Sequence, residues 1–346
     1  LYDHELFQQA LSRQWNQKRL NRKPLEESVK EPVLFVIDYE DGLRASMLTL
    51  NGAVENWTAA WRYGDDSADS TLFWTKAYKI VGFRFDLMSF HPKSTMEMLR
   101  QELDALTEGS DGVDGSAVFV YGEAWNFGDI GNDARFIQSI QRNLGGTGIG
   151  TFNDRLRDSV RGGGPFDSGQ AHITNQGFIS GRFYDPNGDN SGADSEKNDL
   201  LAKADNIRVW LAGGLSDFPL VDASGADVVG NDINYAGQDS GYTLDPQEAI
   251  NYIGKHDNET FWDISQYKHP TGTSTADRVR AHNVGNSFIL LAQGIPFVHA
   301  GQDLLRSKSM DRNSFDSGDW PNEILWDGED TKFRVGLPSQ QESGGN

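Results

Sequence analysis

The chain has 346 residues, a formal net charge of −20, 37% hydrophobic residues and no Cys. This acidity disfavours nucleic acid and anionic membranes as partners. No run of 18 or more apolar residues occurs, so the sequence predicts no membrane span. Without Cys the chain has no disulfide, thiol nucleophile or thiolate metal site. Leu1 is not an initiator Met and no signal peptide is visible, so we expect a processed or trimmed chain.

The first 67 residues carry one buried-strand pattern, in a segment that we treat as divergent. Residues 33–37 are continuously apolar, as in a buried parallel strand, and Asp38 follows them in an acidic turn. We predict that this strand pairs in parallel beside 81–87 and carries Asp38 to the rim of a cleft.

The stretch 81–87 alternates apolar residues with Gly82, Arg84 and Asp86, which is the period of a strand. Alternation puts Arg84 and Asp86 on one face, opposite an apolar face. A cation and a carboxylate there form either a structural ion pair or part of a site.

Other segments give simpler patterns. Residue 66 or 67 begins a predicted helix that runs through Lys79. Residues 162–199 are rich in Gly, Asp, Asn and Ser and predict a long loop. The remaining predictions are helices over 94–106 and 276–292 and strands over 117–123, 206–213 and 295–301. Strand, helix and strand at this spacing indicate the βαβ unit of a parallel sheet.

One segment partly matches a calcium loop. Asp185, Asn187, Asp189 and Glu196 stand at positions 1, 3, 5 and 12 of that template, but Asn190 stands where it requires Gly. We therefore do not expect a calcium loop of this type.

Three acidic residues stand at or just beyond strand ends: Asp86, Glu123 and Asp257. In a (β/α) barrel the C-terminal strand ends converge on one site, however far apart they lie in sequence. Several carboxylates in one cleft suit glycoside hydrolysis, which needs a nucleophile and a proton donor.

The motifs resemble conserved regions of the α-amylase superfamily of glycoside hydrolases, in its type I pullulanase and limit dextrinase branch. They cover about residues 68–338 and include Gly82-Phe83-Arg84-Phe85-Asp86, Tyr121-Gly122-Glu123-Ala124-Trp125-Asn126, Gly148 through Asp158, Lys255-His256-Asp257-Asn258 and Asp303 through Met310.

The resemblance implies an α/β fold, a (β/α)8 TIM-barrel catalytic domain that is partial or has a divergent N-terminal part. It implies Asp86 as nucleophile, Glu123 as general acid/base and Asp257 as transition-state stabiliser. Arg84 would keep Asp86 ionised, and His256 would bind sugar hydroxyls. Trp125 and Asn126 would shape the cleft, although Trp125 could also be a core residue.

The resemblance further implies a retaining hydrolase that cleaves α-1,6 linkages in α-glucans such as pullulan and limit dextrin. It implies no organic cofactor, and calcium is possible. We expect an extracellular location and a polar tail over 339–346. The superfamily's first conserved region is missing upstream of Asp86, so a non-catalytic carbohydrate-binding remnant or inactive fragment is the alternative.

Overall fold

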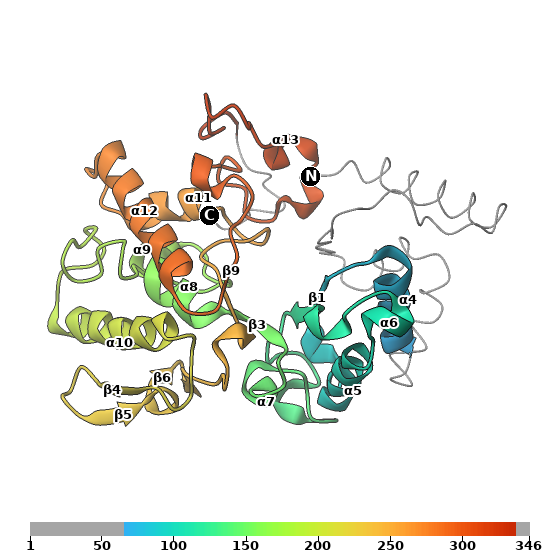
Figure 1. Cartoon of the computed structure of the whole chain (residues 1–346). Coiled ribbons are helices and arrows are strands. Elements are labelled where there is room, and N and C mark those ends of the chain that lie inside the picture. The colour runs from blue at the N-terminus through green and yellow to red at the C-terminus, as the bar shows by residue number, and fades with distance from the viewer. Residues whose placement is uncertain (1–65, 337–346) are drawn as a thin grey trace. The chain divides into compact units, whose positions relative to one another are not determined.

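The computed structural model describes residues 66–336 (Figure 1). The predicted strand over 33–37, Asp38 and the tail lie outside these residues, so their predictions stay untested. The chain divides into two compact units, with the boundary between Thr151 and Phe152. This boundary falls inside the range 68–338 that the motifs cover.

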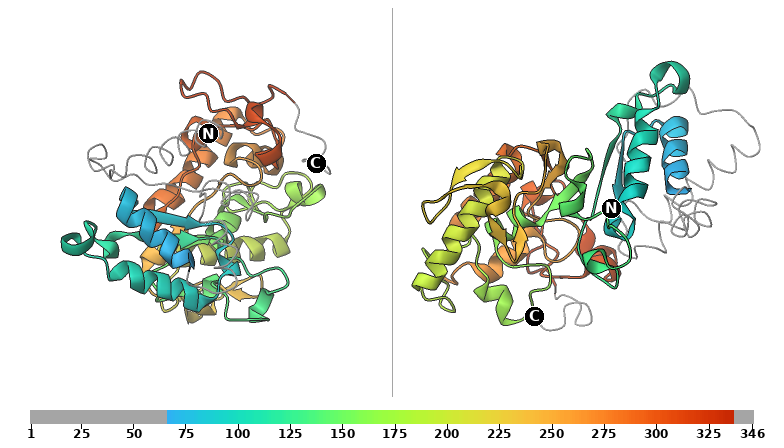
Figure 2. Two further views of the ribbon diagram at one scale, coloured as in Figure 1. Left: turned by 90° about the vertical axis from the view of Figure 1, so that its right-hand side faces the viewer. Right: turned by 90° about the horizontal axis from the view of Figure 1, so that it is seen from below.

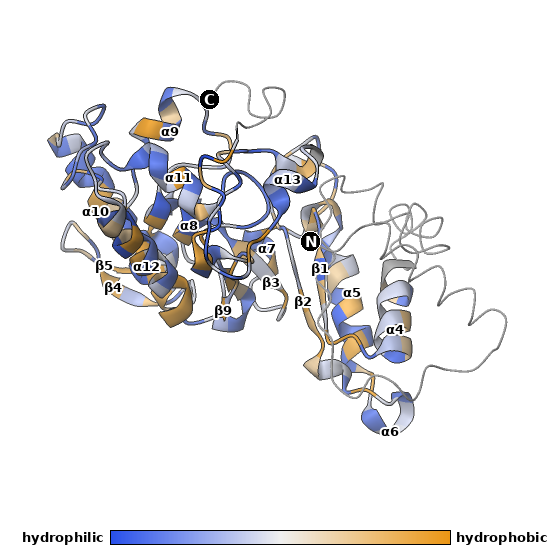
Figure 3. Cartoon of the chain, turned by 90° about the horizontal axis from the view of Figure 1, so that it is seen from above, coloured by the Kyte–Doolittle hydropathy of each residue, from blue (hydrophilic) through white to orange (hydrophobic). Residues whose placement is uncertain are grey.

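Unit 1 is built around parallel strands. These are β1 (Gly82–Phe85), β2 (Phe119–Gly122) and the first half of β3 (Gly150–Asn153). Gly82 pairs with Phe119 and Tyr121 with Gly150, so β2 lies in the middle. Both β1 and β2 are coloured as mainly hydrophobic in Figure 3. The predicted strands over 81–87 and 117–123 are confirmed in shorter form.

Two helices pack on these strands, α4 (Asp66–Tyr78) and α5 (Lys93–Asp104), and Figure 2 shows them side by side. Met96, Leu99 and Leu103 recur at helical spacing on α5 and are buried against β1 and β2. Both helices were predicted to within two residues at each end. The short helices α6 (Glu108–Asp111) and α7 (Gln141–Leu144) also belong to unit 1.

Unit 2 contains the second half of β3, paired into a parallel arrangement with β8 (Ala249–Asn251) and β9 (Ile295–Pro296) in the order β3-β8-β9. The Asn153 Nδ2 atom donates to Asn251 Oδ1 at 2.8 Å, which links β3 to β8. Because β9 spans only Ile295–Pro296, the predicted strand over 295–301 is confirmed only at its first two residues.

Unit 2 also contains two short antiparallel hairpins: β4 (Pro219–Val221) with β5 (Asp227–Val229), and β6 (Asn234–Tyr235) with β7 (Gln238–Asp239).

The α-helices of unit 2 within residues 152–336 are α8 (Asp154–Arg161), α9 (Gln170–Thr174), α10 (Asp194–Leu211), α11 (Phe261–Lys268), α12 (Thr275–Leu291) and α13 (Asp319–Asn322). Figure 1 shows α10 alongside α8. The helix predicted over 276–292 corresponds to α12. The segment 162–199 is mostly irregular, as predicted, but it holds α9 and the start of α10.

The strand predicted over 206–213 is wrong, because these residues form the end of α10. Ile207 and Val209 favour a strand when the run is taken alone. The helix begins upstream, where the Glu196 carboxylate accepts hydrogen bonds from the backbone N–H groups of residues 191–193. Burial of Ile207, Val209 and Trp210 in the core then fixes the last turns as helix.

The described residues show an α/β fold with parallel strands. They include five parallel strands, β1, β2, β3, β8 and β9, where a (β/α)8 barrel has eight. A closed barrel therefore remains a prediction.

Trp210 is the largest fully buried side chain of unit 2 and tests its core. Its ring lies against the backbone at Gly214, where an added Cβ would come within 2.2 Å of the indole. We predict that Trp210→Ala lowers the free energy of unfolding by about 3–5 kcal/mol through the cavity that it leaves. Denaturant unfolding measures this. Trp326→Ala is the control, since Trp326 is 69% exposed and its loss should change stability by about 0.5 kcal/mol or less. Equal losses would show that Trp210 is not a core residue.

Candidate active site

In unit 1, the Arg84 side chain contacts two carboxylates at once. Its Nη1 donates to Asp86 Oδ1 at 3.0 Å and its Nη2 lies 2.9 Å from Glu123 Oε1. The Arg84 and Glu123 side chains are 1% and 5% exposed, and that of Asp86 is 12% exposed. The predicted contact between Arg84 and Asp86 is confirmed, and Glu123 joins them.

The strands place these groups by a close approach of two backbones. Glu123 follows β2, and its N–H donates to Phe85 O at 3.0 Å, at the end of β1. Gly122 makes this approach possible, since a Cβ there would lie 2.4 Å from Phe85 O. Leu87 then turns the chain in a left-handed conformation (φ 43°) and donates its N–H to Glu123 Oε2 at 3.3 Å.

Burial and charge act in opposite directions on Asp86. Desolvation raises its pKa most, the nearby Glu123 carboxylate raises it further, and Arg84 lowers it, with a result of about 7. Arg84 therefore acts in the predicted direction but does not outweigh burial. Two hydrogen-bonded carboxyls on one guanidinium titrate as a pair, and burial together with their like charge favours a proton on that pair.

Trp125 and Asn126 lie in the loop that follows Glu123, and both are half-buried. The Asn126 amide is used within this loop. Its Oδ1 accepts from the Asn132 N–H at 2.7 Å, and its Nδ2 donates to Asn132 Oδ1 at 2.8 Å. Asn126 thus holds the loop shape behind Glu123.

In unit 2, a second cluster of charged and polar side chains is formed by Lys255, His256 and Asp257, in the loop after β8. The Lys255 Nζ forms an ion pair with Asp257 Oδ2, and the His256 Nδ1 lies 2.8 Å from Asp257 Oδ1. Burial alone would raise the pKa of Asp257. The hydrogen bond from His256 and the charge of Lys255 outweigh burial and hold that pKa below its usual range.

A buried carboxylate supports this loop from behind. Asp263, on α11, accepts hydrogen bonds from the Ser307 hydroxyl at 2.5 Å and from the Lys308 N–H at 2.8 Å. The Lys308 Nζ in turn donates to His256 O at 3.0 Å. The motif at 303–310 therefore reaches the Asp257 loop through Lys308.

The structure thus brings Arg84, Asp86 and Glu123 together in unit 1, and His256 and Asp257 together in unit 2. Sequence reasoning missed Lys255 and Lys308 as site residues. Both stand inside the motifs at 255–258 and 303–310, and a Lys two residues before a predicted site Asp is a signal that could have found Lys255.

The calcium-loop residues do not fit a metal. Asn187 Oδ1 accepts from the Asn190 N–H at 3.1 Å, and Asp189 Oδ1 accepts from Gln170 Nε2 at 2.7 Å. Both Glu196 oxygens accept backbone N–H groups at the start of α10. These oxygens are therefore already used as hydrogen-bond acceptors within the fold.

Arg84→Leu tests the balance of charge in unit 1. Without the guanidinium the pKa of Asp86 should rise further above that of the unfolded chain. A carboxyl with a raised pKa contributes stability at low pH that is lost as pH rises through the folded value. We therefore predict a greater loss of stability at pH 8 than at pH 5, by about 1–3 kcal/mol.

Denaturant unfolding at the two pH values measures this difference. Arg135→Leu is the matched control, because the Arg135 side chain is 65% exposed and its ion pair with Asp129 lies at the surface. An equal loss at both pH values for Arg84→Leu would contradict the account.

No family model matches the chain. The pullulanase of Klebsiella pneumoniae is 45% identical over 279 residues, which are 81% of this chain and 24% of that protein. Pullulanase 1, chloroplastic, of Arabidopsis thaliana is 41% identical over 292 residues, which are 83% of this chain and 30% of that protein.

Among solved structures, a maltotriose complex of PulA from Klebsiella pneumoniae matches with a TM-score of 0.76 and 43% identity. The match covers 82% of this chain and 29% of that one. The chain therefore spans less than a third of the length of these relatives. Sequence and fold together confirm the resemblance, and the chain is a partial counterpart of the pullulanases of the α-amylase superfamily.

Proposed function

We propose that the chain carries the working carboxylates of a retaining glycoside hydrolase that cleaves α-1,6-glucosidic linkages in pullulan and branched α-glucans. The observation that carries this proposal is the contact of one buried guanidinium, Arg84, with both Asp86 and Glu123. Retention needs carboxyl groups about 5–5.5 Å apart, whereas inversion leaves about 6.5–9.5 Å for a water molecule. Two carboxylates on one guanidinium favour the shorter separation.

The shared proton fits the roles that the motifs imply. In the productive form Glu123 carries the proton and Asp86 is ionised, with Arg84 holding its oxygen. Glu123 donates that proton to the glycosidic oxygen as the bond breaks, and Asp86 attacks the anomeric carbon to form a glycosyl–enzyme ester. Glu123 then takes a proton from water, which hydrolyses the ester and frees Asp86.

The surroundings of Asp257 shift its pKa in the direction opposite to that of Asp86. Its pKa is held low, so it stays ionised and suits the role of an anion that stabilises positive charge on the sugar ring. We assign this role, and hydroxyl binding by His256, from the motif 255–258. Trp125 is assigned to the cleft wall on the same basis.

Substrate class is proposed from the relatives. The matching Klebsiella structure is described as a maltotriose complex, which supports an α-glucan oligosaccharide or polysaccharide as ligand here. No helix among residues 66–336 is both long and apolar enough to cross a membrane. The Arabidopsis relative is named as chloroplastic, so an extracellular location for this chain stays a prediction.

The test is release of reducing sugar from pullulan by the full 346-residue chain. We predict that Asp86→Asn and Glu123→Gln each remove nearly all turnover, because each keeps the side-chain shape but removes the charge or the proton that the reaction uses. Asp129→Asn is the matched control, since the Asp129 side chain is 69% exposed, and it should retain full turnover.

A variant that keeps more than about a tenth of the turnover has lost under ~1.4 kcal/mol of transition-state stabilisation, and its assigned role would be wrong. Absence of turnover by the unmodified chain, together with retained dextrin binding, would favour the alternative of a non-catalytic remnant.

A further inference from the structure

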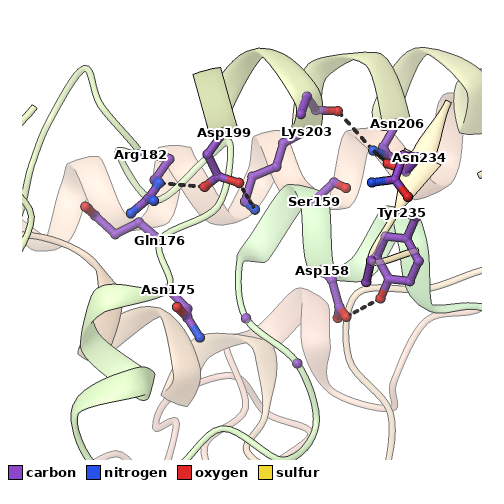
Figure 4. A pocket seen from close by; sticks show the side chains of 14 residues that line it. Asp158, Ser159, Asn175, Gln176, Arg182, Asp199, Lys203, Asn206, Asn234 and Tyr235 are labelled. Carbon is purple, nitrogen blue, oxygen red and sulfur yellow. Dashed lines mark hydrogen bonds and ion pairs between the residues drawn. The ribbon is translucent and has the colours of Figure 1, made fainter. Parts of the chain in front are cut away.

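Unit 2 contains a polar cavity of about 480 Å³ that the proposed mechanism does not use. Side chains from α8, the segment 163–182, α10 and β6 line it (Figure 4). We name it the Tyr235 cavity, after a lining that includes Asp158, Asn175, Arg182, Asp199, Asn206 and Tyr235. Its volume lies in the range of small-molecule sites.

The charges that line the cavity are already paired. Asp199 forms ion pairs with Arg182, whose Nε lies at 2.6 Å, and with Lys203, whose Nζ lies at 3.0 Å, as Figure 4 shows. On the other wall, the Tyr235 hydroxyl donates to Asp158 Oδ2 at 2.6 Å. A free cation or anion would have to break these pairs, so the lining favours a neutral ligand.

Asn206 supplies a buried acceptor that lacks a partner. Its Nδ2 donates to Ala202 O at 3.0 Å and to Asn234 O at 3.2 Å, which fixes the orientation of the amide. Its Oδ1 is buried and has no hydrogen-bond partner among residues 66–336. A buried acceptor without a donor is costly, so a small shift of the amide that exposes this oxygen to the cavity is favoured by a ligand that brings a hydroxyl or N–H group.

Tyr235 adds an aromatic surface beside these polar groups. The Arg155 guanidinium lies 5.1 Å from the centre of its ring and covers one face. The Tyr235 side chain is half-buried, so the ring contributes a fixed apolar patch to the cavity wall. One aromatic ring among amides and paired carboxylates matches a ligand with an apolar face and a polar edge of hydroxyl groups.

We infer that the Tyr235 cavity is a second carbohydrate site, which binds a glucosyl or maltosyl unit of an α-glucan. The choice of α-glucan over another neutral sugar rests on the proposed function. The site holds a chain that is not being cleaved, with Asn206 Oδ1 accepting from a sugar hydroxyl and Tyr235 lying against a sugar ring.

The test uses the full chain with the Asp86→Asn substitution, so that maltotriose is not consumed. In protein-observed NMR, the side-chain amide signal of Asn206 should shift as maltotriose is added, and the shift should saturate. An Asn206 signal that does not move up to about 10 mM maltotriose, which would half-saturate a site that binds with only about 2.7 kcal/mol, overturns the inference.

Titration of variants in the same background gives a second measurement. Tyr235→Ala should weaken maltotriose binding at the Asn206 signal by about tenfold or more, which corresponds to ~1.4 kcal/mol. Asn198→Ala is the matched control. Asn198 is an exposed residue of α10, the helix that also carries Asn206, and it does not line the cavity. Equal affinity in Tyr235→Ala and Asn198→Ala overturns the inference.

The outcome is separate from that of the proposed function. Turnover of pullulan by the unmodified chain without any response at Asn206 would refute only the second site. A saturable response at Asn206 in a chain that releases no reducing sugar would refute only the hydrolase, and leave a carbohydrate-binding protein.

Discussion

The arrangement of unit 1 depends on one buried cation. Arg84 lies on β1 with its guanidinium almost fully covered, and such a group is stable only where its hydrogen bonds and its charge are met. Asp86 and Glu123 meet them, and each carboxylate needs Arg84 in turn because the other carboxylate repels it. The close approach of the two backbones at Gly122 brings Glu123, at the end of β2, near enough to contact Arg84. Removing Arg84 leaves both carboxylates without their buried counter-charge.

The carboxylates of the two units have pKa values shifted in opposite directions. Burial and Glu123 raise the pKa of Asp86 to about 7, whereas Lys255 and His256 hold that of Asp257 below its usual range. Pairs of titratable groups whose surroundings separate their pKa values are the basis for assigning acid and base roles. The surroundings therefore favour a proton on the Asp86–Glu123 pair and the anionic form of Asp257. The supporting contacts of Lys308 and Asp263 fix the loop that carries Asp257.

Local patterns in the sequence predicted the elements that position the site. The alternation at 81–87 located Arg84 and Asp86, and the apolar run at 117–123 placed Glu123 at a neighbouring strand end. The strand predicted at 206–213 failed because the event that decides it, capping by Glu196, lies ten residues upstream. Contacts between residues far apart in the sequence could not be predicted either, such as those of Lys308 with His256 and of Tyr235 with Asp158. These contacts depend on tertiary packing, and the local pattern of apolar residues in the sequence does not indicate them.

The central claim is that Asp86 and Glu123 act as nucleophile and acid/base of a retaining hydrolase. The most direct measurement is the anomeric form of the first product released from pullulan, followed by proton NMR before mutarotation. The account predicts the α-anomer, because two successive displacements at the anomeric carbon restore the configuration of the α-linked substrate. Initial release of the β-anomer would mean a single displacement by water, and would contradict the role of Asp86 as nucleophile.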